Sequence, residues 1–585
     1  MGLSLHMSIV PVIMMVVSLQ VWLPLGCLEE ERTALLQLKD SLNYPNGTSL
    51  PSWRKGDARC CDWDGVGCSS STGRVTGLDL SVVRNGELGD WYLNASLFLP
   101  FQELITLVLM DNQIAGWVEN KECSSNLETL YLSGNNITKV VASGGPINVS
   151  TLYLNNITSY GSSFQTLLQS LGAFPNLTEL GLGYNDLRGR ILGDELRNLS
   201  SLEKLNLDSC SLDENSLQSL GALPSLKNLS LQTLSGALPF QGFLNLKNLE
   251  LMDLSYNTLN SSSIFRTIKT MTSLKILRLQ GCSFNGQLPI SQGLCDLNHL
   301  RELDISSNDL SGFLPPCLAN LTSLQQLDLS SNHLKIPMSL SPLYNLSKLK
   351  SFDGSDNKIY AEEDDHNLSP KFQLESLYLS SRGQVAGAFP KFLYHQFNLQ
   401  SLDLTNIQIK GENRAYFPGL QVLLMSDNGF DGSIPSSLGS MSSLQLLDLS
   451  QFFDRRILSN NSCQEIPGWI GNMSSLEFLD LSRNNLLVLT TEIHGIDFSC
   501  NNFTGEIPPE IGILSKDQGI EPLAQQFDWA KSSNISRLKE IEKLGSFIQQ
   551  IGRKNPLNLQ LFSTPSRSTI QNIQCKKRGG VHTIE

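Results

Sequence analysis

The sequence is short of the residues that carry out catalysis. Its 585 residues include only seven histidines, and none stands at a recognisable motif spacing from a cysteine, serine or carboxylate. A glycine-rich phosphate-binding loop is also missing. We therefore expect isolated histidines at solvent-facing positions, no cofactor, no bound metal and no enzymatic activity.

Positive charge is the second scarcity. Lysine and arginine number 43 against 56 aspartates and glutamates, which gives a net charge of −13. This balance argues against nucleic acid and anionic membrane surfaces as main partners. The imbalance is uneven, because 11 basic and 6 acidic residues follow from Ser515 onward. We expect a boundary near 515 and an atypical basic tail, 515–585, with one amphipathic helix that begins near Ser533 or Asn534.

Long apolar runs are the third scarcity. Beyond the first 26 residues no run of 18 apolar residues occurs, so the sequence predicts no transmembrane span in this chain. The apolar run from Ile9 to Leu23 precedes a small residue and Cys27, which predicts a cleaved signal peptide over 1–26 and entry into the secretory pathway. An uncleaved membrane anchor is the alternative, but the run is shorter than the ~20 residues that a span needs, and it contains Pro11.

Twelve cysteines fit an exported protein. Four cluster near the start, and because Cys60 and Cys61 are sequence neighbours, we expect Cys27 to pair with one of them and Cys68 with the other. A zinc site is disfavoured, because CCDWDGVGC lacks the two-residue gap that lets paired thiolates bind one ion. Cys295 and Cys317 precede consecutive predicted strands, where they either join adjacent turns or remain free thiols.

Most of the chain is a repeat. The stretch from Leu300 to Pro315 reads L-x-x-L-x-L-x-x-N-x-L-x-G-x-x-P, and Ile305 is its last strand anchor. About 18 units, mostly 22 to 26 residues apart, carry an equivalent anchor. The anchors are Leu80, Leu109, Leu132, Leu154, Leu182, Leu207, Leu231, Leu254, Leu279, Ile305, Leu329, Gly354, Leu379, Leu404, Met425, Leu449, Leu481 and Phe498.

Each part of the unit has a physical role. The alternating leucines predict a short strand with one buried face, and stacked units then form a parallel sheet whose other face is free. The asparagine that follows is expected to turn inward, because an amide carries both the donor and the acceptor that a buried turn requires. Cys210 and Cys282 replace it in two units, where we expect small buried thiols rather than a disulfide. The Gly-x-x-Pro endings predict a turn across the lateral face.

A single unit cannot bury its own apolar side, so both ends of the array need a cover. At the N-terminal end EEERTALLQLKDSL predicts a helix with Leu35 and Leu38 on its buried face, and Trp53 and Trp63 supply bulk. The sequence therefore predicts an α/β repeat solenoid of horseshoe form with a parallel sheet on its concave face. We expect a signal peptide over 1–26, a disulfide-bonded N-terminal cysteine cap over 27–71, repeats over 72–514 and the tail.

From Cys27 to Leu514 the sequence closely resembles the extracellular part of the leucine-rich-repeat receptor-like proteins of plants. The matching pieces are CLEEERTALLQLKDSL, CCDWDGVGC, GRVTGLDLS and repeats with L-x-G-x-[IL]-P. The resemblance implies a cell-surface glycoprotein that binds an extracellular peptide, glycan or protein ligand in defence or development. Such a protein would have no kinase of its own and would signal through a partner receptor kinase. The resemblance also implies Cys27–Cys60 and Cys61–Cys68 pairing.

The C-terminal end departs from this pattern. Leu481 and Phe498 are only 17 residues apart, and the further repeats, C-terminal cover and membrane span of the family do not follow. A truncated or misassembled product is therefore one expectation, and a secreted short form is the other. A secreted inhibitor of a cell-wall hydrolase, resembling the polygalacturonase-inhibiting proteins, is the alternative function.

The free face of the sheet is the predicted binding surface. Aromatic and arginine side chains at exposed strand positions are the candidate ligand contacts, although many such positions are only solvated scaffold. These residues are Tyr131, Tyr153, Tyr184, Arg278 and Tyr378. The aspartates in Leu-Asp-Leu contexts recur so regularly that we interpret them as scaffold.

Sixteen N-x-[ST] sequons occur, partly because the repeat contains the phrase N-L-[ST]-x-L. In an exported chain many of them are expected to carry glycans. They are Asn46, Asn94, Asn136, Asn148, Asn156, Asn176, Asn198, Asn228, Asn260, Asn320, Asn345, Asn367, Asn460, Asn472, Asn502 and Asn534.

Overall fold

The structure is a computed structural model of the chain. It describes residues 27–43, 48–84, 89–119, 126–142, 147–157, 164–189, 192–213, 215–217, 220–235, 238, 243, 246–259, 261–288, 293–362, 369–381, 387–410, 417–428, 436–450, 473, 475–481 and 496–497. The predicted signal peptide and the basic tail lie outside these ranges. Among the described residues, no helix is both long enough and apolar enough to cross a membrane.

The chain divides into two compact units. Unit 1 comprises Met1–Phe284 and Ser291–Glu302, and unit 2 comprises Asn285–Ile290 and Leu303–Glu585. Each unit is a leucine-rich-repeat solenoid, as the repeat predicts.

Unit 1 begins with the disulfide-bonded cap. Helix α2 (Glu29–Asn43) has three glutamates in its first turn, where they complement the helix dipole. It buries Leu35, Leu38 and Leu42. Helix η1 (Cys60–Asp62) and β1 (Val66–Cys68) follow, and β1 pairs antiparallel with β2 (Val75–Asp79). The disulfides are Cys27–Cys60 and Cys61–Cys68, the pairing that the resemblance implies.

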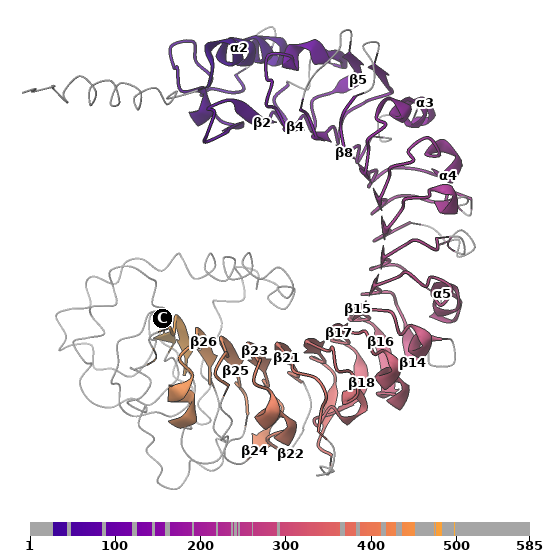
Figure 1. The fold of residues 1–585 in the computed structure, drawn as a ribbon, viewed down its shortest axis with the longest axis vertical. Helices are drawn as coiled ribbons and strands as arrows, with labels where there is room; N and C mark the ends of the chain where they lie inside the picture. Colours follow the sequence, from indigo (N-terminus) through magenta and orange to yellow (C-terminus); the bar gives the residue numbers. More distant parts are fainter. Residues whose placement is uncertain are drawn as a thin grey trace, which may run out of the picture. The chain divides into compact units, whose positions relative to one another are not determined.

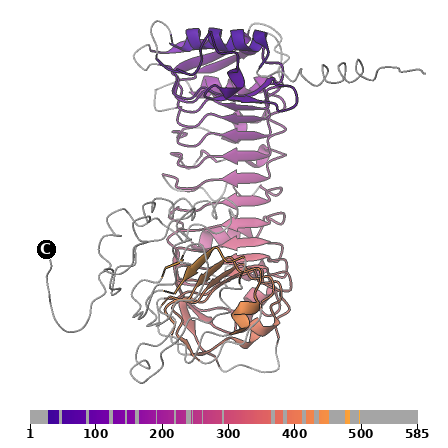
Figure 2. The ribbon, with the colours of Figure 1, turned by 90° about the vertical axis from the view of Figure 1, so that its left-hand side faces the viewer.

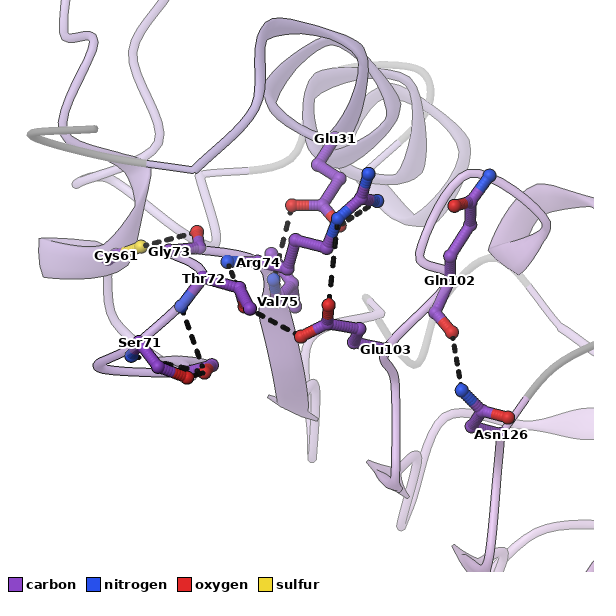
Figure 3. Close-up of polar contacts among 11 residues, drawn as sticks. Glu31, Cys61, Ser71, Thr72, Gly73, Arg74, Val75, Gln102, Glu103 and Asn126 are labelled. Carbon is purple, nitrogen blue, oxygen red and sulfur yellow. Dashed lines mark hydrogen bonds and ion pairs between the residues drawn. The ribbon is translucent and has the colours of Figure 1, made fainter. Parts of the chain in front are cut away.

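A buried carboxylate joins this cap to the first repeat strand (Figure 3). Glu31 is fully buried, accepts a hydrogen bond of 3.1 Å from the backbone N–H of Val75, and lies 3.8 Å from the Arg74 guanidinium. Arg74 in turn lies 3.7 Å from Glu103, which accepts a hydrogen bond of 2.7 Å from Thr72. Burial raises the pKa of Glu31, although the Val75 hydrogen bond and the Arg74 charge oppose the rise.

The repeats of unit 1 contribute one short strand each. After β2 come β4 (Thr106–Val108), β6 (Thr129–Tyr131), β8 (Thr151–Tyr153), β9 (Glu179–Gly181), β10 (Lys204–Asn206), β11 (Asn228–Ser230), β12 (Leu251–Asp253) and β13 (Ile276–Arg278). Neighbours pair in parallel with the central leucine or methionine of each strand in register, so the strands stack like rungs (Figure 2). We call the surface formed by the residues that flank these buried central residues the strand face.

Helices and a second sheet cover the other sides of unit 1. Helices α3 (Phe164–Ser170), α4 (Leu192–Glu195) and α5 (Ser261–Ile268) lie on the side opposite to the strand face (Figure 1). Strands β3 (Trp91–Asn94), β5 (Ile114–Glu119) and β7 (Lys139–Ala142) form a parallel three-stranded sheet, in which the buried Trp117 ring stacks on Phe98 at 6.1 Å.

Unit 2 repeats the same plan. Its strands include β17 (Gln326–Asp328), β19 (Ser351–Asp353), β21 (Ser376–Tyr378), β23 (Ser401–Asp403), β25 (Val422–Leu424), β26 (Leu446–Asp448), β27 (Phe478–Asp480) and β28 (Ile496–Asp497). They pair in parallel in that order. Strand β15 (Glu302–Asp304) lies at the division between the units.

The Gly-x-x-Pro segments of unit 2 differ from the sequence prediction. Where the structure describes their glycines, at Gly286, Gly312 and Gly387, these residues lie in short strands rather than turns. Strands β14 (Asn285–Gln287) and β16 (Asp309–Phe313) form a second parallel sheet with β18 (His333–Pro337) and β20 (Lys358–Tyr360). Strands β22 (Gly387–Ala388) and β24 (Ile409–Lys410) form a further pair. Gly286 and Gly312 have φ of 75° and 89° inside their strands, so the glycine permits a left-handed kink in a chain that continues extended.

The anchors and the asparagines form the core. Every anchor from Leu80 to Leu481 is buried, whereas Phe498 lies outside the described residues. Burial of each leucine side chain stabilises the folded chain by roughly 1.5–3 kcal/mol relative to an exposed side chain. The Asn185 amide donates hydrogen bonds to the Leu154 and Leu182 carbonyls at 2.9 and 2.7 Å, and its Oδ1 accepts one from the Ile157 N–H at 2.7 Å. It therefore joins neighbouring turns, as the repeat predicts.

The cysteines at asparagine positions behave as expected from the sequence. Cys210 and Cys282 are buried free thiols, and their Sγ atoms donate to the Leu182 and Leu254 carbonyls at 3.1 and 3.2 Å. Burial raises the pKa of Cys210 to about 12, so the thiol stays protonated and retains its donor. Cys295 and Cys317, by contrast, are both disulfide-bonded, which excludes the free-thiol alternative for them.

Candidate functional site

The strand face of unit 1 carries three of the predicted contact residues, two on neighbouring rungs and one five rungs further along. Tyr131 ends β6, Tyr153 ends the adjacent strand β8, and Arg278 ends β13. All three side chains are partly exposed beside a buried leucine. Because the rungs are about 4.8 Å apart and held by backbone hydrogen bonds, the face presents side chains at fixed spacing.

Tyr131 and Tyr153 stack on one another. Their ring centroids are 4.6 Å apart, and the ring planes differ by 9°. The far side of the Tyr153 ring covers Gly181 on the next strand, where a Cβ atom would come within 2.4 Å of the ring. Each ring therefore has a neighbour packed on at least one face, and Tyr153 has neighbours on both. This arrangement stabilises the sheet and leaves mainly ring edges for a ligand.

A charged pair continues the face beyond the tyrosines. Glu179 accepts a short hydrogen bond of 2.5 Å from the Tyr153 hydroxyl and lies 2.9 Å from the Lys204 ammonium. Burial opposes ionisation of Glu179, but the hydrogen bonds from Tyr153 and Lys204 outweigh it and lower the pKa of the carboxyl. Burial and the same carboxylate raise the pKa of Tyr153. The site therefore holds a carboxylate and a neutral phenol.

Arg278 is held between two acidic residues. Its Nε lies 2.7 Å from the Glu302 carboxylate, and its Nη1 lies 3.9 Å from Asp253. Asp253 also accepts a hydrogen bond of 2.8 Å from the Gln232 amide. The guanidinium charge is thus compensated inside unit 1. A ligand carboxylate would have to compete with Glu302 for it.

Tyr378 is the predicted contact residue of unit 2. It ends β21, is half-buried, and its hydroxyl lies 3.0 Å from the Ser401 hydroxyl on the neighbouring strand. Aspartates flank it in register, Asp353 on β19 and Asp403 on β23. Their side chains hold the turns that follow, because each accepts the backbone N–H of the residue two positions on, Ser355 or Thr405, at 2.9 Å. This supports the interpretation of the regularly spaced aspartates as scaffold.

The position two residues after each anchor has an unusual backbone conformation. In unit 1 we call these residues the turn row: Val82, Asp111, Gly134, Asn156, Tyr184, Ser209, Thr233, Tyr256 and Gly281. Their φ angles lie between 53° and 69°, in the left-handed region that suits glycine, asparagine and aspartate. A bulky or β-branched residue costs about 1–2 kcal/mol there. Val82, Tyr184, Thr233 and Tyr256 carry that cost.

Tyr184 and Tyr256 are exposed within the turn row. Their side chains are 65% and 47% exposed, so neither offsets the strain by deep burial. Tyr184 is a predicted ligand contact, but it lies after the end of β9 in the turn row rather than at the predicted strand position, and sequence reasoning missed Tyr256. The signal was available, because each tyrosine directly precedes an inward asparagine, Asn185 or Asn257, in a Tyr-Asn pair.

The structure describes nine of the sixteen sequons. Seven of these asparagines are exposed, namely Asn94, Asn148, Asn156, Asn176, Asn198, Asn320 and Asn345, and Asn136 and Asn228 are half-buried. Asn228 lies in β11 on the strand face. The other sequons, Asn46, Asn260, Asn367, Asn460, Asn472, Asn502 and Asn534, lie outside the described residues.

The described part of the chain brings together no group of three or more histidine, cysteine, aspartate or glutamate side chains that could hold a metal ion. His299 is partly buried, and desolvation lowers its pKa. His333 lies 2.9 Å from Asp309 at an exposed position of β18. The arrangement offers a contact surface, and binding is the chemistry that its side chains support.

Three family models match four parts of the chain. A leucine rich repeat N-terminal domain matches residues 28–69, a leucine rich repeat model matches 290–334, and a further one matches 126–146 and 419–441. Similar proteins include Cuscuta receptor 1 of Solanum lycopersicum, 29% identical over 71% of this chain and 48% of its own length. Receptor-like protein 14 of Arabidopsis thaliana is 31% identical over 72% of this chain and 47% of its own length. The chain spans about half the length of these relatives.

Solved structures are similar at lower identity. The plant peptide hormone receptor RGFR1 in complex with RGF2 is 23% identical, with a TM-score of 0.45 over 78% of each chain. A TDR receptor is 21% identical, with a TM-score of 0.45 over 77% of this chain and 80% of that one.

Proposed function

We propose a function for this chain from its family, since it belongs to the leucine-rich-repeat receptor-like proteins of plants. The proposed function is that of a receptor ectodomain at the cell surface, which binds an extracellular peptide, glycan or protein ligand in defence or developmental signalling. The chain would act by binding, without enzymatic activity and without a kinase of its own. Signalling would then need a partner receptor kinase.

The strand face of unit 1 is the observation that carries this proposal. The strand-face strands from β4 to β13 bury their central residues and hold most of the flanking residues at least partly exposed in a fixed parallel register. Such an array loses little conformational entropy when a partner binds, because the backbone is already ordered. Two similar proteins, Cuscuta receptor 1 and Receptor-like protein 14, are named as receptors, which supports a receptor role.

Extracellular placement supports the same role. The apolar N-terminal run, the N-terminal disulfides and the exposed sequons suit a chain that folds in the secretory pathway. We propose the cell surface, facing the apoplast, as the site of action.

A binding experiment with a steric block tests the proposal. The secreted chain is passed over fractionated extracellular peptides, glycans and proteins, and bound material is measured by surface plasmon resonance. Lys204→Trp places a large ring on the strand face at an exposed position of β10. Arg197→Trp is the matched control, because Arg197 is equally exposed in the segment that follows α4, away from that face.

We expect Lys204→Trp to abolish capture of the ligand and Arg197→Trp to leave it unchanged. Both variants should secrete and unfold at the wild-type temperature. Binding that is indifferent to Lys204→Trp would place the ligand site elsewhere, and a wild-type chain that captures nothing from any fraction contradicts the proposed function itself.

A further inference from the structure

Two of the four strained residues in the turn row of unit 1 are exposed tyrosines. Tyr184 and Tyr256 adopt φ of 60° each, in a row where glycine, aspartate and asparagine occur without strain. Strained residues persist where the surrounding structure fixes them, and they concentrate at ligand contacts. The backbone is fixed here, because the N–H of Tyr184 donates to the Asp208 carbonyl at 2.8 Å and that of Tyr256 to the Gln280 carbonyl at 2.6 Å.

The two rings differ from the stacked pair in the same unit. Tyr131 and Tyr153 cover one another, and Tyr153 covers Gly181. Tyr256 rests against Gly281 on the next rung, where a Cβ atom would come within 2.8 Å of the ring, and it remains 47% exposed. Tyr184 is 65% exposed. These two aromatic surfaces are therefore open to a ligand.

The spacing of the two tyrosines sets the length of that ligand. Ser209 and Thr233 occupy the turn row between them, so the rings stand three rungs apart. At about 4.8 Å per rung this separation is roughly 14 Å. One small molecule cannot contact both rings, whereas a short linear polymer can.

The charged groups beside and between the rings are already ion-paired or hydrogen-bonded, and carboxylates outnumber cations among them. The cations on the intervening and flanking strands are ion-paired, Lys204 with Glu179 and Arg278 with Glu302. Asp208 is satisfied by the Ser230 hydroxyl at 2.6 Å and by the Gln232 N–H at 2.8 Å. Hydroxyl and amide groups dominate the remaining surface.

This combination matches the chemistry of an uncharged sugar chain. The C–H face of a pyranose ring is apolar and packs on an aromatic face, while its hydroxyls require donors and acceptors of the amide and hydroxyl kind. An acidic glycan would need an unpaired cation, which the two ion pairs do not supply.

We propose that Tyr184 and Tyr256 are specificity-determining platforms for a neutral linear oligosaccharide, which spans the turn row of unit 1 between them. This inference rests on the proposed function and narrows the ligand of the same surface to one chemical class. Strain at the two positions is then the stability cost of keeping two aromatic platforms in reach of the ligand.

Glycine substitutions separate this role from a structural one. Tyr184→Gly and Tyr256→Gly remove the platforms and relieve the left-handed strain, as Gly134 and Gly281 show in the same row. Val82→Gly is the matched control, because Val82 is 68% exposed at the same register and lies four rungs before Tyr184. Tyr184→Phe and Tyr256→Phe keep the rings and serve as the conservative variants.

The experiment measures binding of the secreted chain to immobilised neutral oligosaccharides, namely linear β-linked glucan and xylan fragments. Acidic oligogalacturonides and a set of extracellular peptides serve as the other arms. We expect neutral fragments to bind, each tyrosine-to-glycine variant to weaken binding roughly tenfold or more, and the melting temperature not to fall. Val82→Gly and the phenylalanine variants should bind like the wild type.

Three results would overturn the inference. Neutral fragments that do not bind the wild-type chain would exclude the class, and so would tyrosine-dependent binding of the acidic or peptide arm. Binding that survives both glycine substitutions would exclude the platforms. If the chain binds the peptides or the acidic fragments instead, the oligosaccharide inference fails but the receptor role stands. If the chain binds nothing in any arm, the proposed function itself fails.

Discussion

Asp328 and Asp353 occupy paired positions at the ends of adjacent strands β17 and β19 in unit 2. Burial, together with the neighbouring carboxylates, raises the pKa of Asp328, and burial and the charges of Asp403 and Asp304 raise the pKa of Asp353. Ser330 and Ser355 donate backbone hydrogen bonds of 2.9 Å to the two carboxyls, which opposes the rise without cancelling it. Two acidic groups of unit 2 are therefore easier to protonate in the folded chain than in the unfolded chain.

The first prediction concerns stability against pH. A carboxyl whose pKa is raised by folding binds more protons in the folded state, so its contribution to stability falls as pH rises above the ordinary value of 3.8. We expect unit 2 to be more stable at pH 5 than at pH 8. Denaturant unfolding across this range measures the effect.

Asp328→Asn is the decisive variant for that prediction, because asparagine imitates the protonated acid and still accepts the Ser330 hydrogen bond. The variant should flatten the pH dependence and gain stability relative to wild type at pH 8. Asp309→Asn is the control, since Asp309 is exposed in β16 and does not pair in register with Asp328 or Asp353. An unchanged slope in Asp328→Asn would show that other groups determine the pH dependence.

The second prediction compares two occupants of the inward position. Asn185 satisfies the Leu154 and Leu182 carbonyls and the Ile157 N–H, whereas the thiol of Cys210 makes one weak bond, to the Leu182 carbonyl. Asn185→Ala should therefore cost about 2–4 kcal/mol, because it leaves buried backbone groups unpaired. Cys210→Ala should cost about 1 kcal/mol, mainly through lost packing. Equal costs in denaturant unfolding would mean that the asparagine hydrogen bonds add nothing to stability.

The repeat pattern was sufficient to predict much of the fold. Anchor spacing predicts the strands, and the inward asparagines follow from the sequence because their short amide carries both donors and an acceptor. The second sheet of unit 2 was not predicted, because Gly and Pro are typical of turns in sequence. Gly312 instead permits a kink inside β16, and the neighbouring strands β14 and β18 supply its backbone hydrogen bonds.

The candidate site was predicted less completely. The repeat predicts that Tyr131 and Tyr153 are exposed at strand positions. It does not predict that their rings stack on one another, because the stacking depends on the side-chain rotamers. Tyr184 and Tyr256 lie in the turn row, whose left-handed backbone does not follow from the spacing of the anchors.

The third prediction concerns the buried carboxyl of the cap. Glu31→Gln retains an acceptor for the Val75 N–H, and burial already favours the neutral form of Glu31. This substitution should therefore lower the free energy of unfolding only slightly. Glu31→Ala leaves the Val75 N–H unpaired in the core and should cost about 1–3 kcal/mol. Native-state hydrogen exchange at β2 measures the local effect. Equal protection of β2 in the two variants would show that Glu31 does not hold the cap to the first strand.

The fourth prediction concerns glycan occupancy. Asn228 is half-buried and stands on the strand face between Lys204 and Leu251 in the register of β10 to β12. A glycan there would cover the surface on which the proposed ligand site depends. We therefore expect Asn228 to be unmodified, while exposed asparagines such as Asn198 and Asn320 carry glycans.

Enzymatic deglycosylation in heavy-oxygen water, followed by peptide mass spectrometry, labels each asparagine that carried a glycan. Asn228→Gln should then add only one methylene to the mass of the secreted chain and leave its ligand binding unchanged, whereas Asn198→Gln should lower the mass by one glycan. Full occupancy of Asn228 would contradict a ligand site on β10 to β12, because the attached sugar and the ligand would compete for the same rungs. Occupancy together with a gain of binding in Asn228→Gln would instead identify the glycan as a block on that site.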